Sequence, residues 1–221
     1  MRKTKFKNGE YFHIYNRGTD KREIFSDRYD YIRFLESLNL FNGIESIGSI
    51  YELAFRKKRD VEAEPPIGGS ASNSENHLVE IVAYSLLPNH FHLLLKQVQE
   101  NGISEFMHRI GGYTLFYNKK YKRSGALFQG PFQSVYIDSE SYLNYISAYI
   151  NGNPEIHKIK KAEEYIWSSY QDYLGNRNGV LANKSIILKD FSSTNEYRKY
   201  VEEVIKNSSE IKEAKKQYLL E

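Results

Sequence analysis

Apolar side chains recur along the chain with two different periods, and the change from one period to the other divides the chain into expected strands and helices. Residues 10–16 alternate between apolar and polar positions and are rich in aromatic rings, which predicts a first strand. Two further strands are predicted at 79–87 and 90–96, joined by a tight turn at Pro88-Asn89, and a short fourth strand is predicted at 134–137.

Helical spacing of apolar residues occurs after the first strand and again after the third. The first helix is predicted over about 28–42, with Ser26 or Asp27 as its N-cap. The second covers about 103–121 and contains Gly111-Gly112. Because each glycine costs a helix about 1 kcal/mol relative to alanine, we expect a kink or a close backbone approach at this pair.

A third helix is predicted over about 140–151. It would end at Asn153-Pro154, because the residue before a proline is pushed out of helical geometry. Residues 167–174 predict a short helical or turn segment that packs on the core. The tail from about 195 to 220 is rich in Lys and Glu and carries apolar residues at helical spacing in its first half, so it predicts an amphipathic helix.

The order strand–helix–strand–strand–helix–strand predicts an α+β fold, a ferredoxin-like sandwich with a central antiparallel sheet and helices packed mainly on one face. We expect this domain to span residues 1–178 and a C-terminal helical extension to follow over 179–221. Residues 57–76 are rich in charge, Pro, Gly and Ser. Such a stretch cannot bury enough apolar surface to offset its ordering entropy, so it is interpreted as a flexible insertion within the domain.

The composition excludes several classes of protein. Of the 221 residues, 40% are hydrophobic, which is enough for one sizeable core, and no apolar run is long enough to predict a membrane span. The chain has no cysteine, which excludes disulfides, a thiolate nucleophile and cysteine-bound zinc. Residues 1–7 are basic but no apolar signal segment follows them, so a cytoplasmic protein is expected.

The net charge of +3 is only mildly basic, but the positive side chains are clustered. One cluster lies in and after the second predicted helix, interleaved with tyrosine and phenylalanine rings; its members are Arg109, Lys119, Lys120, Lys122 and Arg123. Cations neutralise phosphates and aromatic rings stack on unpaired bases, so this mixture fits single-stranded nucleic acid. A solvated helix face would look similar, and the charge pattern leaves both interpretations open.

The third predicted strand begins with two histidines, His90 and His92. Side chains alternate across a strand, so both imidazoles would lie side by side on one face of the sheet. Two adjacent imidazoles on a rigid strand can form half of a divalent-metal site. The alternative is that one is a hydrogen-bonded core residue and the other is exposed. His13 could face the same sheet surface, although a structural role is favoured for it.

The segment that leads into Pro154 offers partners for these histidines. Tyr142, Tyr145, Tyr149 and Asn153 follow one another at spacings of three and four residues, so they share one helix face. Tyr149 and Asn153 lie one turn apart, which would direct a phenol and an amide oxygen toward a common point. The alternative is an amphipathic helix whose tyrosines pack on the sheet.

Five sequence blocks occur in an order that is typical of one known family. They are HIYNRG at 13–18, LPNHFHLL at 87–94, RSGALFQG at 123–130, YINGNP at 149–154 and WSSY at 167–170. With these blocks the sequence resembles the single-tyrosine transposases of the HUH nuclease superfamily (IS200-like transposases), and most closely their REP-associated tyrosine transposase branch. The resemblance covers roughly residues 9–175.

The resemblance implies a metal-dependent DNA transposase or strand transferase that cleaves single-stranded, hairpin-bearing DNA. His90, His92 and Asn153 would bind Mg2+ or Mn2+, and Tyr149 would attack the scissile phosphodiester. This attack would leave a 5′-phosphotyrosine link and a free 3′-OH. The residues expected to contact DNA are Arg17, Arg109, Lys119, Lys120, Lys122, Arg123 and Gln129. Relatives are known as monomers and as dimers that exchange the tyrosine helix, so a homodimer is one of two expected assemblies.

Two departures from the family pattern support a different hypothesis. Pro131 stands where the family usually has an arginine, and residues 155–158 replace a basic, glycine-containing stretch. The alternative function is therefore a non-catalytic or domesticated DNA-hairpin-binding protein of the same fold. A metal-dependent hydrolase of another substrate is a third and weaker option. Tyr145, one turn before Tyr149, is the alternative nucleophile.

Overall fold

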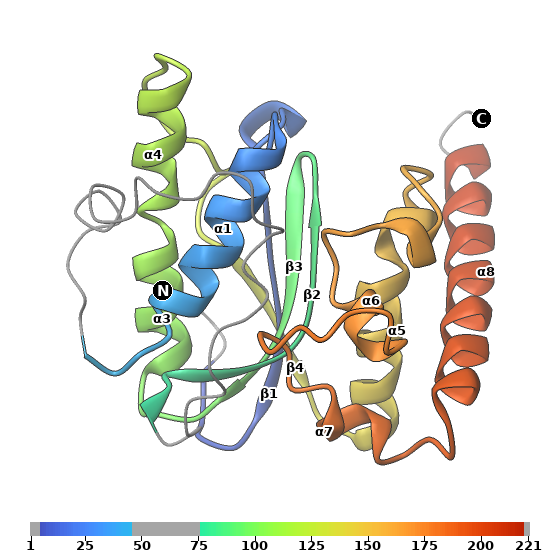
Figure 1. Cartoon of the computed structure of the whole chain (residues 1–221). Coiled ribbons are helices and arrows are strands. Elements are labelled where there is room, and N and C mark those ends of the chain that lie inside the picture. Colours follow the sequence, from blue (N-terminus) through green and yellow to red (C-terminus); the bar gives the residue numbers. More distant parts are fainter. Residues whose placement is uncertain (1–4, 46–75, 219–221) are drawn as a thin grey trace.

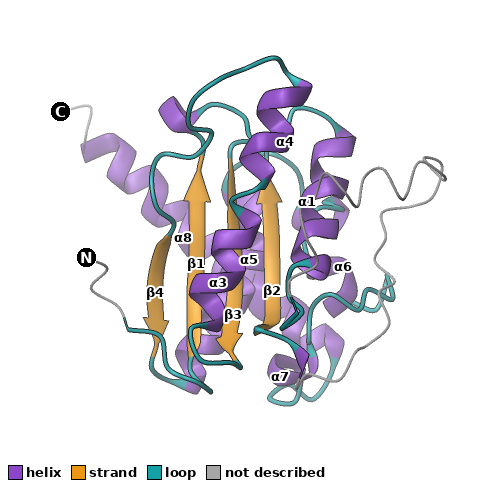
Figure 2. Ribbon diagram, turned by 90° about the vertical axis from the view of Figure 1, so that its left-hand side faces the viewer, coloured by secondary structure: helices purple, strands orange, loops and turns teal. Residues whose placement is uncertain are grey.

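A four-stranded antiparallel sheet lies at the centre of the computed structural model, which describes residues 5–45 and 76–218 (Figure 1). The strands are β1 (Tyr11–Arg17), β2 (Val79–Leu87), β3 (His90–Gln97) and β4 (Gln133–Ile137). Their order across the sheet is β2-β3-β1-β4, with every neighbouring pair antiparallel (Figure 2). With helices between β1 and β2 and between β3 and β4, the predicted α+β, ferredoxin-like fold is confirmed. The predicted insertion at 57–76 lies outside the described residues except for its last position.

One face of the sheet is covered by three helices, α1 (Arg28–Leu40), α3 (Gly102–Ile110) and α4 (Tyr113–Lys120) (Figure 1). Asp27 caps α1, as expected, through a reciprocal arrangement. Its carboxylate accepts a hydrogen bond from the N–H of Asp30, and the Asp30 carboxylate accepts one from the N–H of Asp27. The second predicted helix is divided into α3 and α4 at Gly111-Gly112, where a kink was expected.

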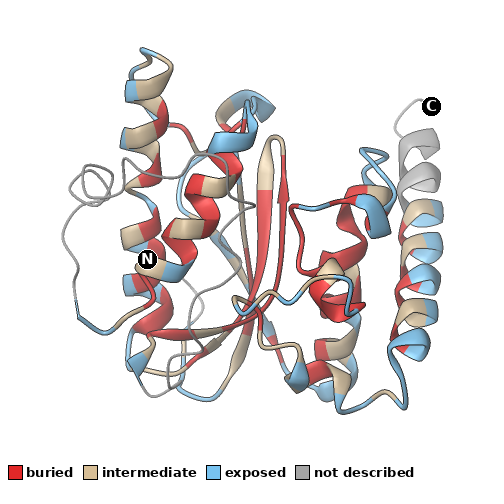
Figure 3. Ribbon diagram, viewed as in Figure 1, coloured by how far each residue is buried: buried red, intermediate tan, exposed pale blue. Residues whose placement is uncertain are grey.

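The opposite face is covered by helices that follow β4, which are α5 (Glu140–Ile156), α6 (Tyr170–Tyr173), α7 (Ser185–Leu188) and α8 (Thr194–Tyr218) (Figure 1). Helices therefore cover both faces, whereas we expected them mainly on one. The reason is that β2 and β3 are apolar on both sides. Phe91 and Leu93 join the core under α1, whereas Val82 and Leu94 join the core under α5 and α8. Both strands are buried along most of their length (Figure 3). Two short 3-10 turns, Thr19–Lys21 and Ala162–Glu164, also occur.

Helix α5 continues through Pro154 to Ile156, so the predicted end at Asn153-Pro154 is wrong. A proline has no N–H, and the last turn therefore lacks one hydrogen bond. Packing holds this turn instead, because Pro154 and Ile156 are buried and α5 packs along α8 and across β2 and β3. His157 follows as the C-cap, and its N–H donates to the carbonyl of Asn153 (3.0 Å). The extra turn places His157 on the helix face that holds Tyr149 and Asn153.

Helix α8 is the amphipathic helix predicted near the C-terminus. It buries Tyr197, Val201 and Val204 in the core that it shares with α5. The two helices approach closely at Gly152, where an added Cβ would lie 2.6 Å from Cγ1 of Ile205. Over the described ranges, no helix is both long and apolar enough to cross a membrane.

Candidate metal and tyrosine site

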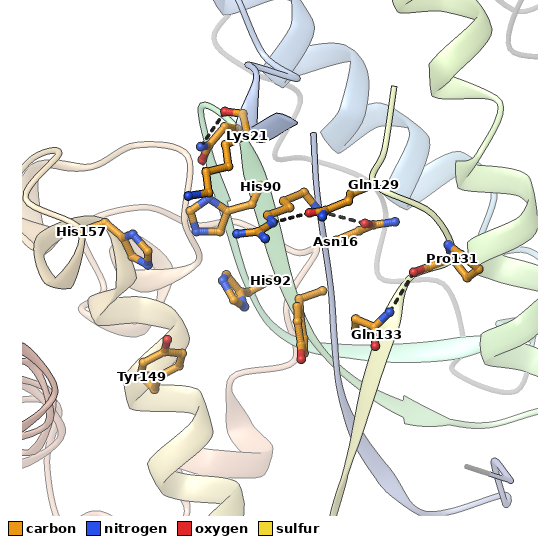
Figure 4. A pocket seen from close by; sticks show the side chains of 12 residues that line it. Asn16, Lys21, His90, His92, Gln129, Pro131, Gln133, Tyr149 and His157 are labelled. Carbon is orange, nitrogen blue, oxygen red and sulfur yellow. Dashed lines mark hydrogen bonds between the residues drawn. The ribbon is translucent and has the colours of Figure 1, made fainter. Parts of the chain in front are cut away.

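A cleft of about 720 Å³ opens at the end of the sheet where β1 finishes and β3 begins (Figure 4). The residues that line it are Tyr15, Asn16, Arg17, Lys21, Asn89, His90, His92, Gln129, Pro131, Gln133, Tyr149 and His157. None of these residues is Asp or Glu, whereas Arg17 and Lys21 are cationic. The cleft therefore suits a negatively charged ligand.

His90 and His92 lie on the cleft side of β3, as the alternation of side chains predicts, with their ring centroids 5.2 Å apart. Nδ1 of His90 lies 2.6 Å from Oδ1 of Asn89, and Nδ1 of His92 lies 2.8 Å from Nε2 of His13. His13 thus reaches the same sheet surface from β1, which the sequence allowed but did not favour. His13 and His92 are buried, with 7% and 8% of their surface exposed, whereas His90 is half-buried.

Burial keeps two of the site's side chains uncharged. It lowers the pKa of His13 from 6.5 to about 4. It also raises the pKa of the Tyr149 phenol above its usual value of 10, although a hydrogen bond with Asn153 acts in the opposite direction. At pH 7 His13 is therefore a neutral imidazole and Tyr149 a neutral phenol.

Tyr149 lies on the face of α5 that is turned toward the histidines, and Asn153 follows one turn later (Figure 4). The Tyr149 ring centroid lies 6.1 Å from that of His92 and 6.4 Å from that of His13. Asn153 is fully buried behind the cleft wall, and its Nδ2 donates to the backbone carbonyl of Tyr149 (3.4 Å). Its buried Oδ1 has no hydrogen-bond partner among the described residues. The tyrosine and the histidine pair therefore meet within one chain.

Tyr145, the alternative nucleophile, lies outside this arrangement. Its ring stacks on that of Tyr149 with the centroids 6.4 Å apart, but Tyr145 is 37% exposed and does not line the cleft. Of the two phenols, only that of Tyr149 faces the histidines.

The cleft residues that were not expected from the sequence include His157 and Lys21. The His157 ring centroid lies 4.7 Å from that of His90. Its spacing of four residues from Asn153 would have revealed the shared helix face, but the helix was expected to end before it. Lys21 lies in a turn with a left-handed backbone (φ 60°), where no periodic pattern could place its side chain.

The mouth of the cleft is built where the end of β1 meets the loop before β4. Nδ2 of Asn16 donates to the carbonyl of Gly130 (3.0 Å), and Nε of Arg17 donates to Oε1 of Gln129 (2.6 Å). The N–H of Gln129 donates in return to the carbonyl of Arg17 (2.9 Å). At Gly18, the next position, an added Cβ would overlap the backbone of the following turn, so the chain needs glycine there. This arrangement brings Arg17 and Gln129, two of the predicted DNA contacts, to the cleft.

The other predicted DNA contacts do not line the cleft; they are Arg109, Lys119, Lys120, Lys122 and Arg123. Nζ of Lys120 lies 2.7 Å from carboxylate oxygens of both Asp27 and Asp30, and it ties α4 to the start of α1. Arg109 donates to the carbonyl of Gly43 (2.6 Å) and pairs with Glu105 (2.9 Å). These two cations therefore stabilise the fold.

The cleft is poor in the anionic ligands that many metal sites use. Over the described part of the chain, no three His, Cys, Asp or Glu side chains form a group that could hold a metal ion. A cation bound here would need imidazole nitrogens together with amide or DNA oxygens.

Two comparisons with known proteins concern the sequence family and the fold. The family model described as "Transposase IS200 like" matches residues 70–153, fewer than half of the 221 positions but a range that includes His90, His92, Tyr149 and Asn153. The fold matches a solved structure described as "Structure of the REP associates tyrosine transposase bound to a REP hairpin". The TM-score is 0.52 at 12% sequence identity, over 79% of this chain and 85% of that one. No curated protein matches the sequence.

A central segment of the sequence is therefore similar to the IS200-like transposases, and the chain shares its fold with the REP-associated tyrosine transposase.

Proposed function

We propose that this protein is a metal-dependent, single-strand DNA transposase that cleaves and transfers strands with Tyr149 as its nucleophile. The observation that carries the proposal is the meeting of Tyr149 with His90 and His92 in one cleft that contains cations and no carboxylate. The family match supports DNA strand transfer, and the hairpin bound to the structural neighbour supports a hairpin-bearing single strand as the substrate.

The side chains present fit a divalent cation. Nδ1 of each histidine is engaged by a neighbouring side chain, so Nε2 is the ring nitrogen that can bind a metal. Oδ1 of Asn153 is a buried acceptor without a hydrogen-bond partner among the described residues, beside Tyr149. We infer that His90, His92 and Asn153 are the protein ligands of Mg2+ or Mn2+. A bound cation would polarise the scissile phosphate and offset the charge that develops on it.

In the proposed step, Oη of Tyr149 attacks the phosphorus, the Oη–P bond forms and the P–O3′ bond breaks. The phenol loses its proton during the attack, because its raised pKa keeps it protonated beforehand. The departing 3′ oxygen takes up a proton, so the products are a 5′-phosphotyrosine and a free 3′-OH. Arg17 and Lys21 lie where they can bind the flanking phosphates. The phosphotyrosine bond keeps the energy of the phosphodiester, so a 3′-OH can reverse the step and join the strand elsewhere.

The test is to incubate the full-length protein with hairpin-bearing single strands and Mn2+ and to resolve the products on a denaturing gel. We expect the wild type and Tyr145→Phe to form a covalent protein–DNA adduct and Tyr149→Phe to form none. Tyr145 is a matched control because it lies one turn away on α5 and outside the cleft. An undiminished adduct with Tyr149→Phe would exclude the proposal.

A second candidate function, a non-catalytic hairpin-binding protein, is favoured by one observation. Pro131 lines the cleft at the position where the resemblance expects an arginine, so one phosphate contact is lost at its mouth. This function predicts salt-sensitive hairpin binding without an adduct under any divalent metal. The same gel, run beside a binding titration at two salt concentrations, distinguishes the two functions.

A further inference from the structure

We propose that His13 and Asn89 are positioning residues that set the tautomers of His92 and His90, so that Nε2 of each ring carries no proton. This inference rests on the proposed function, because it assigns a purpose to two side chains behind the proposed metal ligands. A neutral imidazole carries one proton, and only the nitrogen without that proton can bind a metal. A side chain that accepts a hydrogen bond from Nδ1 therefore decides which nitrogen remains for the cation.

For His90 the structure fixes the direction of the hydrogen bond. Nδ2 of Asn89 lies 3.0 Å from the carbonyl of Lys21, which can only accept. This contact determines the orientation of the Asn89 amide, and it turns Oδ1 toward His90. Oδ1 can only accept as well, so the proton in the 2.6 Å contact belongs to Nδ1 of His90. The tautomer of His90 is thus set by a backbone carbonyl at the turn that holds Lys21.

For His92 the partner is His13, at 2.8 Å between Nδ1 of His92 and Nε2 of His13. One of these nitrogens must donate and the other accept. If Nε2 of His13 donated, His92 would carry its own proton on Nε2 and could not bind a metal with it. Nε2 of His92 is unprotonated only when His13 accepts, which requires the proton of His13 to lie on its Nδ1.

The surroundings of His13 hold this pair in place. His13 and His92 lie on the neighbouring strands β1 and β3, where Tyr15 is the direct partner of His92 and His13 lies two residues away. The ring of Tyr15 packs against both, with centroids 5.1 Å from His13 and 5.7 Å from His92. Both imidazoles are almost fully buried, so their rings cannot turn without displacing these neighbours. Nε2 of His13 is therefore held in position against Nδ1 of His92.

The direct test is imidazole 15N nuclear magnetic resonance on the full-length, metal-free protein at neutral pH. The wild type is expected to show the Nδ1–H tautomer for His90 and His92. In His13→Leu, which removes the acceptor, His92 is expected to lose this preference, whereas His90 is unchanged. In Asn89→Leu, His90 is expected to lose the Nδ1–H preference, whereas His92 is unchanged. An Nε2–H tautomer at His92 in the wild type would overturn the proposal.

A Mn2+ titration followed by electron paramagnetic resonance gives the second readout. His13→Leu and Asn89→Leu are each expected to bind Mn2+ about 10- to 100-fold more weakly than the wild type. His13→Gln should recover most of the affinity, because its side-chain oxygen can accept from His92. His108→Leu, which removes a histidine from α3 outside the cleft, should have no effect.

The two readouts separate this inference from the proposed function. If His13→Leu binds Mn2+ as tightly as the wild type, the positioning role is wrong while the metal site stands. If the wild type shows the expected tautomers but binds no Mn2+ with or without hairpin DNA, the proposed metal chemistry fails and the tautomer assignment remains correct.

Discussion

Two buried polar clusters in this protein differ in how completely their groups are paired. In the first, here called the Asp172 cluster, Nε and Nη2 of Arg177 each lie 2.7 Å from an oxygen of the Asp172 carboxylate. The same guanidinium donates to the hydroxyl of Tyr84 (2.9 Å) and the carbonyl of Ser168 (2.7 Å), and the N–H of Gly179 donates to the carboxylate (3.0 Å). Its charges are matched and its acceptors are filled.

The second cluster, here called the histidine cluster, consists of His13, His90, His92 and Asn153. It contains no carboxylate, and burial keeps His13 neutral. Oδ1 of Asn153 has no hydrogen-bond partner in the described part of the chain. A buried acceptor left unpaired destabilises the fold, and a cation bound at this position would remove that cost.

The comparison shows how structural and functional polar groups can be told apart here. The Asp172 cluster binds the segment after α5 to β2, and every group in it has a purpose within the fold. The histidine cluster instead contains acceptor atoms at and beside the cleft, which a bound cation would satisfy. Breaking the pairs of the first cluster should therefore reduce stability, and removing the acceptors of the second should reduce binding.

The largest expected effect is on stability, in the Asp172 cluster. Asp172 is fully buried, so Asp172→Ala leaves the guanidinium of Arg177 without its counter-charge. We expect the free energy of unfolding in urea to fall by about 3–5 kcal/mol. The double variant Asp172→Ala/Arg177→Met should recover part of this loss. If the free energy of unfolding of the single variant fell by less than about 1 kcal/mol, the structural role of the Asp172 cluster would be contradicted.

The second effect is a pH dependence of stability that comes from His13. Its pKa is about 4 in the folded protein against 6.5 when unfolded, so between these values the unfolded chain takes up a proton that the folded protein does not. The stabilisation is complete above pH 6.5 and is lost as the pH falls toward 4, by about 3 kcal/mol at most. Urea unfolding of the metal-free protein should show this loss, and it should be smaller in His13→Gln. Equal acid sensitivity of the two proteins would contradict the assignment.

A smaller effect on stability is expected at Asn153. Replacing Asn153 with Leu removes an unpaired buried acceptor at similar volume, so the free energy of unfolding should change by less than about 1 kcal/mol. The same variant should bind Mn2+ at least about 10-fold more weakly. A large loss of stability with unchanged Mn2+ affinity would show that Asn153 belongs with the structural cluster.

The smallest expected effect is on the salt dependence of hairpin binding. It distinguishes a cationic side chain that lines the cleft from one that is held in an ion pair. Arg17→Gln should weaken hairpin binding and reduce the slope of log affinity against log salt by about 1, because one phosphate contact is lost. Lys120→Gln should leave the slope unchanged, because Lys120 is held by Asp27 and Asp30. Binding titrations at several salt concentrations measure both, and equal slopes for the two variants would contradict this distinction.

Local patterns were sufficient to predict the sheet and the outline of the site. Local apolar patterns located all four strands, the alternation of side chains placed His90 and His92 on one face, and helical spacing put Tyr149 one turn before Asn153. These features depend on the geometry of a single strand or helix, which a short window of sequence carries.

The features that were missed depend on contacts between distant segments. Packing against α8 extends α5 past Pro154, and the extra turn places His157 in the cleft. The ion pairs of Lys120 with Asp27 and Asp30 join residues about ninety positions apart. The contact between His13 and His92 joins residues 79 positions apart. A sequence pattern within one strand or helix cannot show contacts between residues this far apart in the chain.

The most direct test of the metal–tyrosine site is an anomalous difference map from crystals of the Tyr149→Phe protein grown with a hairpin-bearing single strand and Mn2+. We predict a manganese peak in the cleft, coordinated by Nε2 of His90, Nε2 of His92 and Oδ1 of Asn153, with a DNA phosphate beside it. A map with the strand bound and no manganese in the cleft, or manganese held by other residues, would contradict the account.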